Sequence, residues 1–237
     1  MKILALDTAT ECCSAALWLD GALQTRADRR ARGAGELILP MIEQLLLAAA
    51  VSLASLDALA FGRGPGSFTG VRLAASVAQG LAFAAELPVI PISDLRALAA
   101  GALSQPAAPA HVLVCLDARM SEVYWGCFER HQTLSGPGVR LVGQEAVSAP
   151  AQVRLPEAWA GLPVCAAGSG FGAYAALLQP RLTLAPTWEE LLPHAREIAL
   201  LAAQDGLACA VAAEAALPVY LRDNVAHPET AASQRLG

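Results

Sequence analysis

Two aspartates, Asp7 and Asp117, each end a run of apolar residues that is typical of a buried β-strand. Asp7 precedes Thr8, and a third apolar run is followed by Gly168-Ser169-Gly170. A carboxylate at a strand end can hold hydrated Mg²⁺ beside phosphates, and glycine lets a backbone come close. We therefore expect the candidate nucleotide-binding residues to be Asp7, Thr8, Asp117, Gly168 and Gly170. The alternative is that the aspartates and the threonine only cap turns and helices.

The segment from Gly62 to Arg72 carries four glycines and one proline between an apolar run and an alanine-rich helical pattern. It predicts the end of a strand, a tight turn and a helix that begins near Ser67 or Thr69. Its spacing matches neither the P-loop nor the dinucleotide-binding fingerprint. The pattern leaves open whether the segment is an anion site at a helix N-terminus or a structural turn.

Metal-ligating patterns are missing from the sequence. The histidines are not three or four residues apart and do not stand at ligand spacing from a cysteine. We therefore expect no protein-bound catalytic metal. The six cysteines form no Cys-x-x-Cys pair, which is typical of a reducing compartment, and we expect a cytoplasmic location.

The composition narrows the class of partner. The chain has 237 residues, is 55% hydrophobic and 16% charged, and carries a net charge of −5. Low charge leaves apolar surface for an interface, while the acidic balance argues against independent binding to nucleic acid. Asp7 interrupts the first apolar run, and two prolines break the longest uncharged stretch, 97–116. We expect no signal peptide and no membrane-spanning helix.

The elements that must position these residues follow the same order twice: three strands, a helix, a strand and a helix. In the first half we expect strands at 2–7, 12–19, 22–29, 57–62 and 88–92, and helices at 36–50, 68–86 and 94–104, the last capped by Ser93. In the second half we expect strands at 111–117, 121–129, 139–143 and 163–167, and helices at 171–179 and 188–204, the latter opened by a capping box of Thr187 and Glu190.

This repeat predicts an α/β fold with two similar lobes, 1–106 and 107–237. Ligands of such sheets tend to lie at the carboxyl ends of the strands. Asp7, Asp117 and Gly168 would then line one crevice between the lobes.

The helices expected at 36–50 and 68–86 have wider apolar faces than packing on one sheet requires. They are either buried within one domain or form a bundle between molecules, and the pattern favours neither. Small residues at four-residue spacing in the second helix would permit close helix contact. The candidate partner-binding residues are Leu37, Met41, Leu45, Val71, Ala74 and Ala78.

Four strings together resemble the signature of the bacterial TsaB family, formerly YeaZ. They are Ile3–Thr10, Gly62–Arg72, Asp117–Trp125 and Pro218–Val225, and the resemblance runs from residue 1 to about residue 228. The second string is shared with the paralogous TsaD and Kae1-type proteins.

The resemblance implies an actin/Hsp70/sugar-kinase-like (ASKHA) fold with two similar βββαβα lobes. It implies a non-catalytic subunit that binds TsaD, with the ATPase TsaE, in threonylcarbamoylation of the adenosine adjacent to the anticodon of ANN-decoding tRNAs. Family members use the first two helices as a dimer surface, so a homodimer is expected when the chain is alone. The chain would contact tRNA indirectly, through the complex that it forms with its partners. No cofactor is expected to be tightly bound, and ATP or ADP with Mg²⁺ would be held at the complex interface.

Two departures from family patterns are visible. The catalytic relative carries a His-x-x-x-His metal pair, which this chain lacks, and many members have His-Ser-Glu where this chain has Ala34-Gly35-Glu36. Two other functions stay open. One is a free-standing ASKHA-type nucleotide phosphotransferase or ATPase, and the other is a peptidase, which the missing metal pair disfavours.

Overall fold

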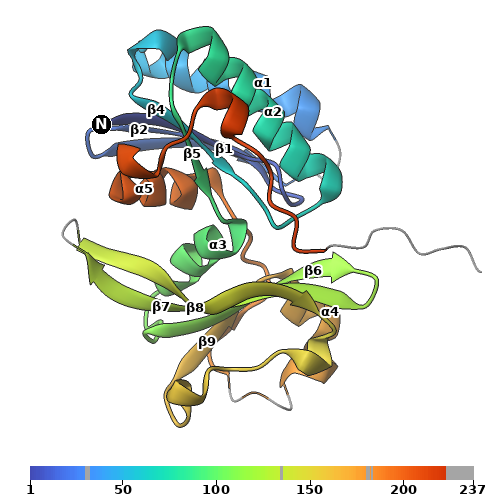
Figure 1. Ribbon diagram of the computed structural model, residues 1–237. Helices are drawn as coiled ribbons and strands as arrows, with labels where there is room; N and C mark the ends of the chain where they lie inside the picture. The colour runs from blue at the N-terminus through green and yellow to red at the C-terminus, as the bar shows by residue number, and fades with distance from the viewer. Residues whose placement is uncertain (30–32, 134–135, 180–181, 183, 223–237) are drawn as a thin grey trace, which may run out of the picture.

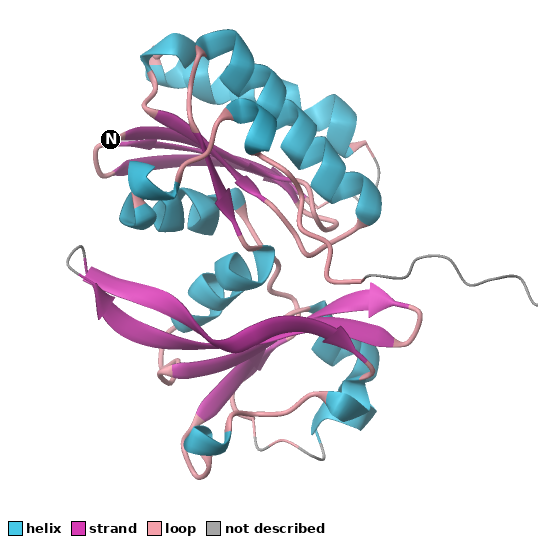
Figure 2. Cartoon of the chain, viewed as in Figure 1, coloured by secondary structure: helices cyan, strands magenta, loops and turns pink. Residues whose placement is uncertain are grey.

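Two five-stranded sheets repeat one topology in the computed structural model, which describes residues 1–29, 33–133, 136–179, 182 and 184–222. The first sheet has the order β3-β2-β1-β4-β5, and the second, read in the same sense, has the order β8-β7-β6-β9-β10. In each sheet the central strand pairs antiparallel with its hairpin partner and parallel with the strand on its other side. Figure 2 shows both sheets in magenta with helices between and outside them. The predicted duplication is confirmed.

The first half follows the expected elements within two residues at every boundary. The Asp20-Gly21 turn has positive φ at both residues, 48° and 106°, as a tight two-residue hairpin requires. Ser67, not Thr69, caps α2 by accepting from Gly70 N at 3.1 Å. The elements are β1 (Lys2–Asp7), β2 (Cys13–Leu19), β3 (Ala22–Asp28), α1 (Ala34–Ala49), β4 (Ala58–Gly62), α2 (Phe68–Ala85), β5 (Val89–Ile92) and α3 (Asp94–Leu103), which Ser93 caps.

The second half differs from prediction in three ways: its last helix begins later, the strands expected at 121–129 and 139–143 are longer, and a short strand that was not expected precedes that helix. Its elements are β6 (His111–Arg119), β7 (Glu122–Thr133), β8 (Gly136–Ser148), β9 (Val164–Ala167), α4 (Ser169–Leu178), β10 (Thr187–Trp188) and α5 (Ala195–Asp205). Short 3-10 helices lie at Leu53–Ser55, Pro150–Gln152, Glu157–Trp159, Leu207–Cys209 and Ala213–Ala215.

The expected helix 188–204 and its capping box are wrong. Thr187 lies in β10, which pairs with β9, so it caps no helix. The helix begins at Ala195, where the ring nitrogen Nδ1 of His194 accepts from Arg196 N at 2.9 Å. Pro193 explains the late start, because it has no N–H to donate and disfavours helical backbone at the residue before it.

The helices form layers around the two sheets. The helices α1 and α2 cover the outer face of the first sheet, α4 covers the outer face of the second, and α3 and α5 lie between the sheets (Figure 1). Strand alternation creates this order: Leu4 and Leu6 face α1 and α2, while Ile3 and Ala5 face inward. By length and composition α2 could span a membrane, but core helices pass the same test, and one side of α2 packs on the sheet.

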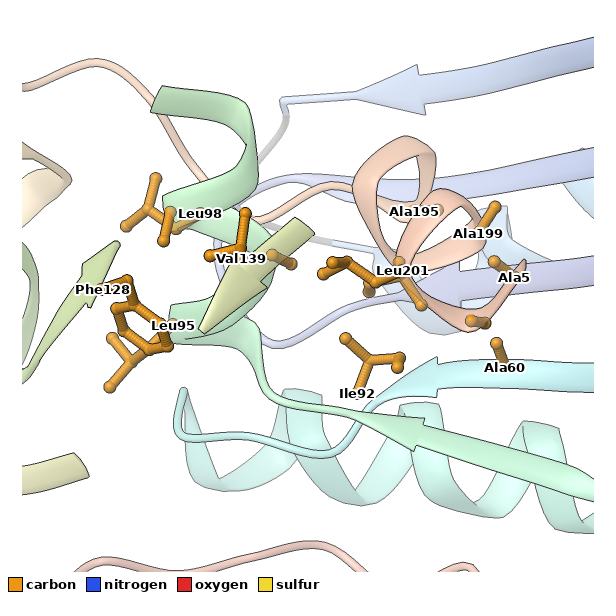
Figure 3. Packing of buried hydrophobic residues seen from close by; sticks show 14 of the residues in the cluster. Ala5, Ala60, Ile92, Leu95, Leu98, Phe128, Val139, Ala195, Ala199 and Leu201 are labelled. Atoms are coloured by element: carbon orange, nitrogen blue, oxygen red, sulfur yellow. The ribbon is translucent and has the colours of Figure 1, made fainter. Parts of the chain in front are cut away.

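The two halves exchange a helix. From the second half, α5 packs on β1, β2 and β4 of the first sheet, while α3 packs on the second sheet. Small side chains permit the close approach, with Ala5 and Ala60 facing Ala195 and Ala199 (Figure 3). The division into lobes 1–106 and 107–237 stays a prediction. Each sheet lies on its own side of residue 106, whereas α5 crosses to the other.

Candidate functional site: the cleft between the lobes

A cavity of about 450 Å³ lies between the two lobes. Its walls come from the residues after β1, the start of α2, the end of β6 and the start of α4. The segment Val219–Arg222 also lines it. Asp117 is part of this lining, as predicted, whereas Asp7 and Gly168 lie behind the wall.

Asp7 is fully buried and shares its environment with a second carboxyl, that of Asp94 at the start of α3. Both carboxyls lie against Gly62, where a Cβ would come within 2.3 Å of Asp94 Oδ1 and 2.9 Å of Asp7 Oδ1. Burial raises the pKa of Asp7 to about 6, and burial followed by the charge of Asp7 raises the pKa of Asp94 well above its ordinary value. Ionising both carboxyls in this buried site is therefore disfavoured.

The pair of carboxyls joins three loops. Asp7 Oδ1 accepts from Ala9 N at 2.7 Å, and Asp94 Oδ2 accepts from Gly64 N at 2.5 Å. Asp7 Oδ2 and Asp94 Oδ1 are buried and receive no N–H from the part of the chain that the structure describes. Through the bonds to Ala9 N and Gly64 N, the pair links the end of β1, the glycine segment Gly62–Arg72 and α3.

Thr8 and the glycine segment Gly62–Arg72 are in direct contact. Thr8 Oγ1 donates to Gly70 O at 2.7 Å, and a Cβ at Gly70 would lie only 2.0 Å from Thr8 O. The glycine therefore serves to let the start of α2 touch the loop after β1. Of the two interpretations left open by the sequence, this geometry supports the structural turn.

The glycines at the start of α4 have the same use. A Cβ at Gly168 would lie 2.3 Å from Cys115 O, and one at Gly170 would lie 2.8 Å from Cys115 Cβ. Gly168 also has a φ of +108°, which L side chains rarely adopt. Both glycines let α4 pack closely on β6. Their lack of a side chain therefore serves internal packing and not the approach of a ligand.

Asp117 is the predicted residue that reaches the cavity, and its oxygens are already engaged. Oδ1 accepts from Arg119 N at 2.8 Å and from the Tyr174 hydroxyl at 3.2 Å, and Oδ2 pairs with Arg119 Nη1 at 3.0 Å. Its own N–H donates to Ser169 Oγ at 3.1 Å. Asp117 thus orders the end of β6 and its junction with α4.

The turn that follows Asp117 is strained. Arg119, Met120 and Ser121 have φ values of 61°, 54° and 60°, all in the left-handed region. Non-glycine residues pay on the order of 1–2 kcal/mol each for this conformation. Met120 is 60% exposed at the rim of the cleft. Such strain persists only where surrounding contacts hold the turn.

A stack of side chains forms the opposite rim. The Arg72 guanidinium lies 3.4 Å from the centroid of the Phe68 ring and 5.5 Å from that of Tyr220. Arg72 Nε donates to the Tyr220 hydroxyl at 2.8 Å. These cation–π contacts and this hydrogen bond fix the C-terminal segment to α2.

The residues present do not form a cradle for Mg²⁺-nucleotide phosphates. The predicted glycines are filled by the protein's own backbone, Asp7 and Thr8 are sealed beneath the wall, and Asp117 is paired. Within the described ranges no group of three or more His, Cys, Asp or Glu side chains is placed to hold a metal ion. Nucleotide binding by this chain stays a prediction.

The predicted partner-binding residues divide into two groups. Leu45, Val71, Ala74 and Ala78 are buried in the core beneath α1 and α2, so they are not available to a partner in this structure. Leu37 and Met41 are partly exposed. Three large apolar side chains on the outward sides of the same helices are exposed: Leu39 (50%), Leu47 (72%) and Phe83 (81%). The apolar residues of α1 and α2 therefore fill the core on the inner side of each helix and leave apolar surface on the outer side.

Sequence reasoning assigned no role to Asp94, Tyr220 or Arg222. Asp94 stands beside a cap residue after β5, a strand that the topology places at the same sheet edge as Asp7. This position after a parallel strand is the sequence feature that could have indicated that Asp94 lies near Asp7. Tyr220 and Arg222 belong to a string that was singled out, but their contacts depend on how the chain returns to the cleft. Residues 223–225 of that string lie outside the described residues.

Comparison with known proteins identifies relatives along nearly the whole chain. The family model described as TsaD, tRNA N6-adenosine threonylcarbamoyltransferase, matches residues 29–230. The tRNA threonylcarbamoyladenosine biosynthesis protein TsaB of Escherichia coli K12 is 42% identical, over 95% of this chain and 96% of its own. The protein of the same name in Haemophilus influenzae is 40% identical, over 95% of each chain.

A solved structure agrees with the sequence relatives. YeaZ from Pseudomonas aeruginosa superposes with a TM-score of 0.84 and 42% identity, covering 93% of this chain and 99% of its own. A second structure with the same figures is described as an uncharacterized protein with similarity to peptidase YEAZ. The chain therefore has a TsaD-like α/β fold of the ASKHA type and belongs to the TsaB (YeaZ) family.

Proposed function

We propose that this chain is a non-catalytic subunit in the biosynthesis of threonylcarbamoyladenosine on tRNA. In this role it binds TsaD, with TsaE joining them, while TsaD modifies the adenosine next to the anticodon of ANN-decoding tRNAs. The names of its relatives support the pathway. The observation that carries the non-catalytic role is the sealed wall of the cleft, where Asp7, Thr8 and the glycines are used for internal packing. We place the protein in the cytoplasm.

The outward sides of α1 and α2 support the choice of partner-binding surface. Leu39, Leu47 and Phe83 project apolar area from two helices that lie side by side on one face of the molecule (Figure 1). Exposed apolar groups of this size on a chain with few charges favour a protein–protein interface. The same surface would pair two copies of the chain when TsaD is absent.

We expect Phe83→Glu to weaken the complex with TsaD strongly. Burying an uncompensated carboxylate at the centre of an apolar contact should weaken binding about thirtyfold or more, the size of a hot-spot loss. Size-exclusion chromatography with light scattering, on the chain mixed with its cognate TsaD, measures this directly. The wild-type pair should elute as one heterodimer and the variant as two separate species.

The matched control is Leu177→Glu, because Leu177 is a 50% exposed leucine on α4 of the other lobe. It adds the same charge at a distant apolar position and should leave the heterodimer intact. Ala78→Glu is unsuitable, since Ala78 is buried and the variant would report unfolding. Loss of the complex in both variants, or in neither, would contradict this surface as the binding site.

The second candidate function is a nucleotide phosphotransferase, favoured only by Asp117 at the wall of the cleft. We expect titration calorimetry of the isolated chain with Mg²⁺-ATP or Mg²⁺-ADP to give no binding heat, because the phosphate cradle is filled. Binding that Asp117→Asn removed would revive the phosphotransferase. Nucleotide binding that needed TsaD would instead place the nucleotide between the subunits.

A further inference from the structure

The segment Leu217–Arg222, here called the strap, crosses from one lobe to the other at the cleft. In Figure 1 this red segment leaves the side of α2 and runs down toward the β6–β7 end of the lower lobe. On the first lobe, Val219 N donates to Arg63 O at 2.7 Å, and Tyr220 joins the Arg72 stack. Val219–Arg222 line the cavity, so the strap forms part of its wall.

On the second lobe the strap is held by one guanidinium. Arg222 Nη2 donates to Ala118 O at 3.1 Å and to Glu122 Oε2 at 2.5 Å, and Arg222 Nη1 contacts Met120 Sδ at 3.6 Å. Ala118 and Glu122 flank the left-handed turn between β6 and β7, and Met120 lies within it. Only 18% of the Arg222 side chain is exposed, so its charge-assisted bonds are shielded from water.

The strap is attached by few groups. Leu217 is 60% exposed and Tyr220 is 46% exposed, and the strap lies outside the strands of both sheets. Segments with exposed backbone and few buried apolar contacts open at low free-energy cost without global unfolding. The attachment to the second lobe depends mainly on Arg222, because Tyr220 is bound to the first.

We propose that the strap is an intramolecular latch that closes the cleft, with Arg222 as the group that fastens it to the β6–β7 turn. When Arg222 is docked, the strap covers the cavity and ties the lobes together at this rim. When Arg222 is released, the strap swings away with the first lobe, the cleft opens and the strained turn loses the contacts that hold it. This device requires no partner, so it stands or falls apart from the proposed function.

The test is the rate at which a thiol placed in the cleft reacts with a maleimide. Thr10 lines the cavity, and Cys209 is the exposed cysteine among the described residues. The parent protein is therefore the full chain with Thr10→Cys and Cys209→Ser. Adding Arg222→Ala should raise the labelling rate on the order of tenfold, since a shielded charge-assisted attachment is lost. Arg222→Lys, which keeps the charge without the fork, should give an intermediate rate.

A matched control is Arg140→Ala, which removes an arginine from an ion pair with Glu129 on the same lobe, away from the cleft. It should leave the rate unchanged. Mass spectrometry of the labelled protein separates strap opening from unfolding, because five native cysteines are buried and stay unlabelled unless the core opens.

Glu122→Gln is an independent test, because it weakens the same ion pair with Arg222 from the side of the second lobe. It should raise the rate in the same direction, and the Arg222→Ala, Glu122→Gln double variant should react no faster than Arg222→Ala alone. A rate in Arg222→Ala equal to that of Arg140→Ala, with the buried cysteines protected, would overturn the latch. So would fully additive effects of the two substitutions.

Discussion

Gly70→Ala should lower the free energy of unfolding by at least about 3 kcal/mol, the range of severe overpacking in a core. The added Cβ would lie 2.0 Å from Thr8 O and 2.6 Å from Ser67 Oγ, and the nearer obstacle is backbone that cannot rotate away. The first turn of α2 would have to move off the loop after β1. That shift would also break the Thr8 hydroxyl bond to Gly70 O.

Gly80→Ala is the matched control, because Gly80 lies on the same helix and a Cβ there meets no atom within 4 Å. Alanine is the better helix former, so this variant should gain roughly 0.5–1 kcal/mol. Urea unfolding followed by circular dichroism measures both. If Gly70→Ala and Gly80→Ala change the free energy of unfolding by the same amount, Gly70 is not required for close packing. A strong loss would also explain the glycine without invoking a ligand.

Asp94→Asn should stabilise the protein at pH 8 by at least about 2 kcal/mol relative to wild type. In the wild type two buried carboxyls share one site, and ionising both is opposed by burial and by their mutual repulsion. An asparagine can accept from Gly64 N with its oxygen and donate to Asp7 with its amide. Asp7 then ionises beside a neutral donor.

The direction with pH follows from the raised pKa values. The unfolded chain releases the Asp7 proton near its ordinary pKa of 3.8, whereas the folded chain holds it to about 6. The stability contributed by this proton is present below pH 3.8 and is lost as the pH rises through 6, by about 3 kcal/mol for such a shift. Asp94, raised further by burial and by Asp7, extends the loss to higher pH.

Urea unfolding at pH 4 and pH 8 tests this pair. Asp94→Asn and wild type should be similar at pH 4, where both carboxyls are protonated, and should diverge at pH 8. Asp94→Ala should be less stable at both values, because Gly64 N then loses its acceptor. Asp20→Asn is the control on an exposed aspartate, whose pKa is lowered by its bond to the N-terminal amine, and its effect should have the opposite sign. An Asp94→Asn advantage that is the same at both pH values would refute the raised pKa values of the pair.

Alternating apolar residues and turn signals predicted nearly every strand and the order of elements, because those patterns act over a few neighbouring residues. The misplaced helix start at 188 shows where local reasoning failed. Thr187 and Glu190 imitate a capping box, but the edge of β9 recruits Thr187 into a strand and Pro193 delays the helix. The exchange of α3 and α5 between the sheets leaves no local signal, since alanines on a helix face are compatible with many neighbours.

The candidate site was predicted in part. The strand-end argument placed both Asp7 and Asp117 at the cleft; Asp117 lies there, whereas Asp7 is buried behind the wall. The partner that decides the state of Asp7, Asp94, is distant in sequence and meets it only through the parallel order β1-β4-β5. Likewise, glycines suggested close approach without saying to what, and the approaching group is the protein's own backbone.

The exchanged helices also set the order in which a nascent chain can mature. The ribosome completes the first sheet early, yet the inner face of that sheet is covered by α5, which is made only after the whole second sheet. Until then the inner-face residues of β1 and β4, among them Ala5 and Ala60, lack the alanines of α5 that pack against them. A damaging substitution in α5 should therefore destabilise the first sheet, although that sheet is synthesised long before the helix.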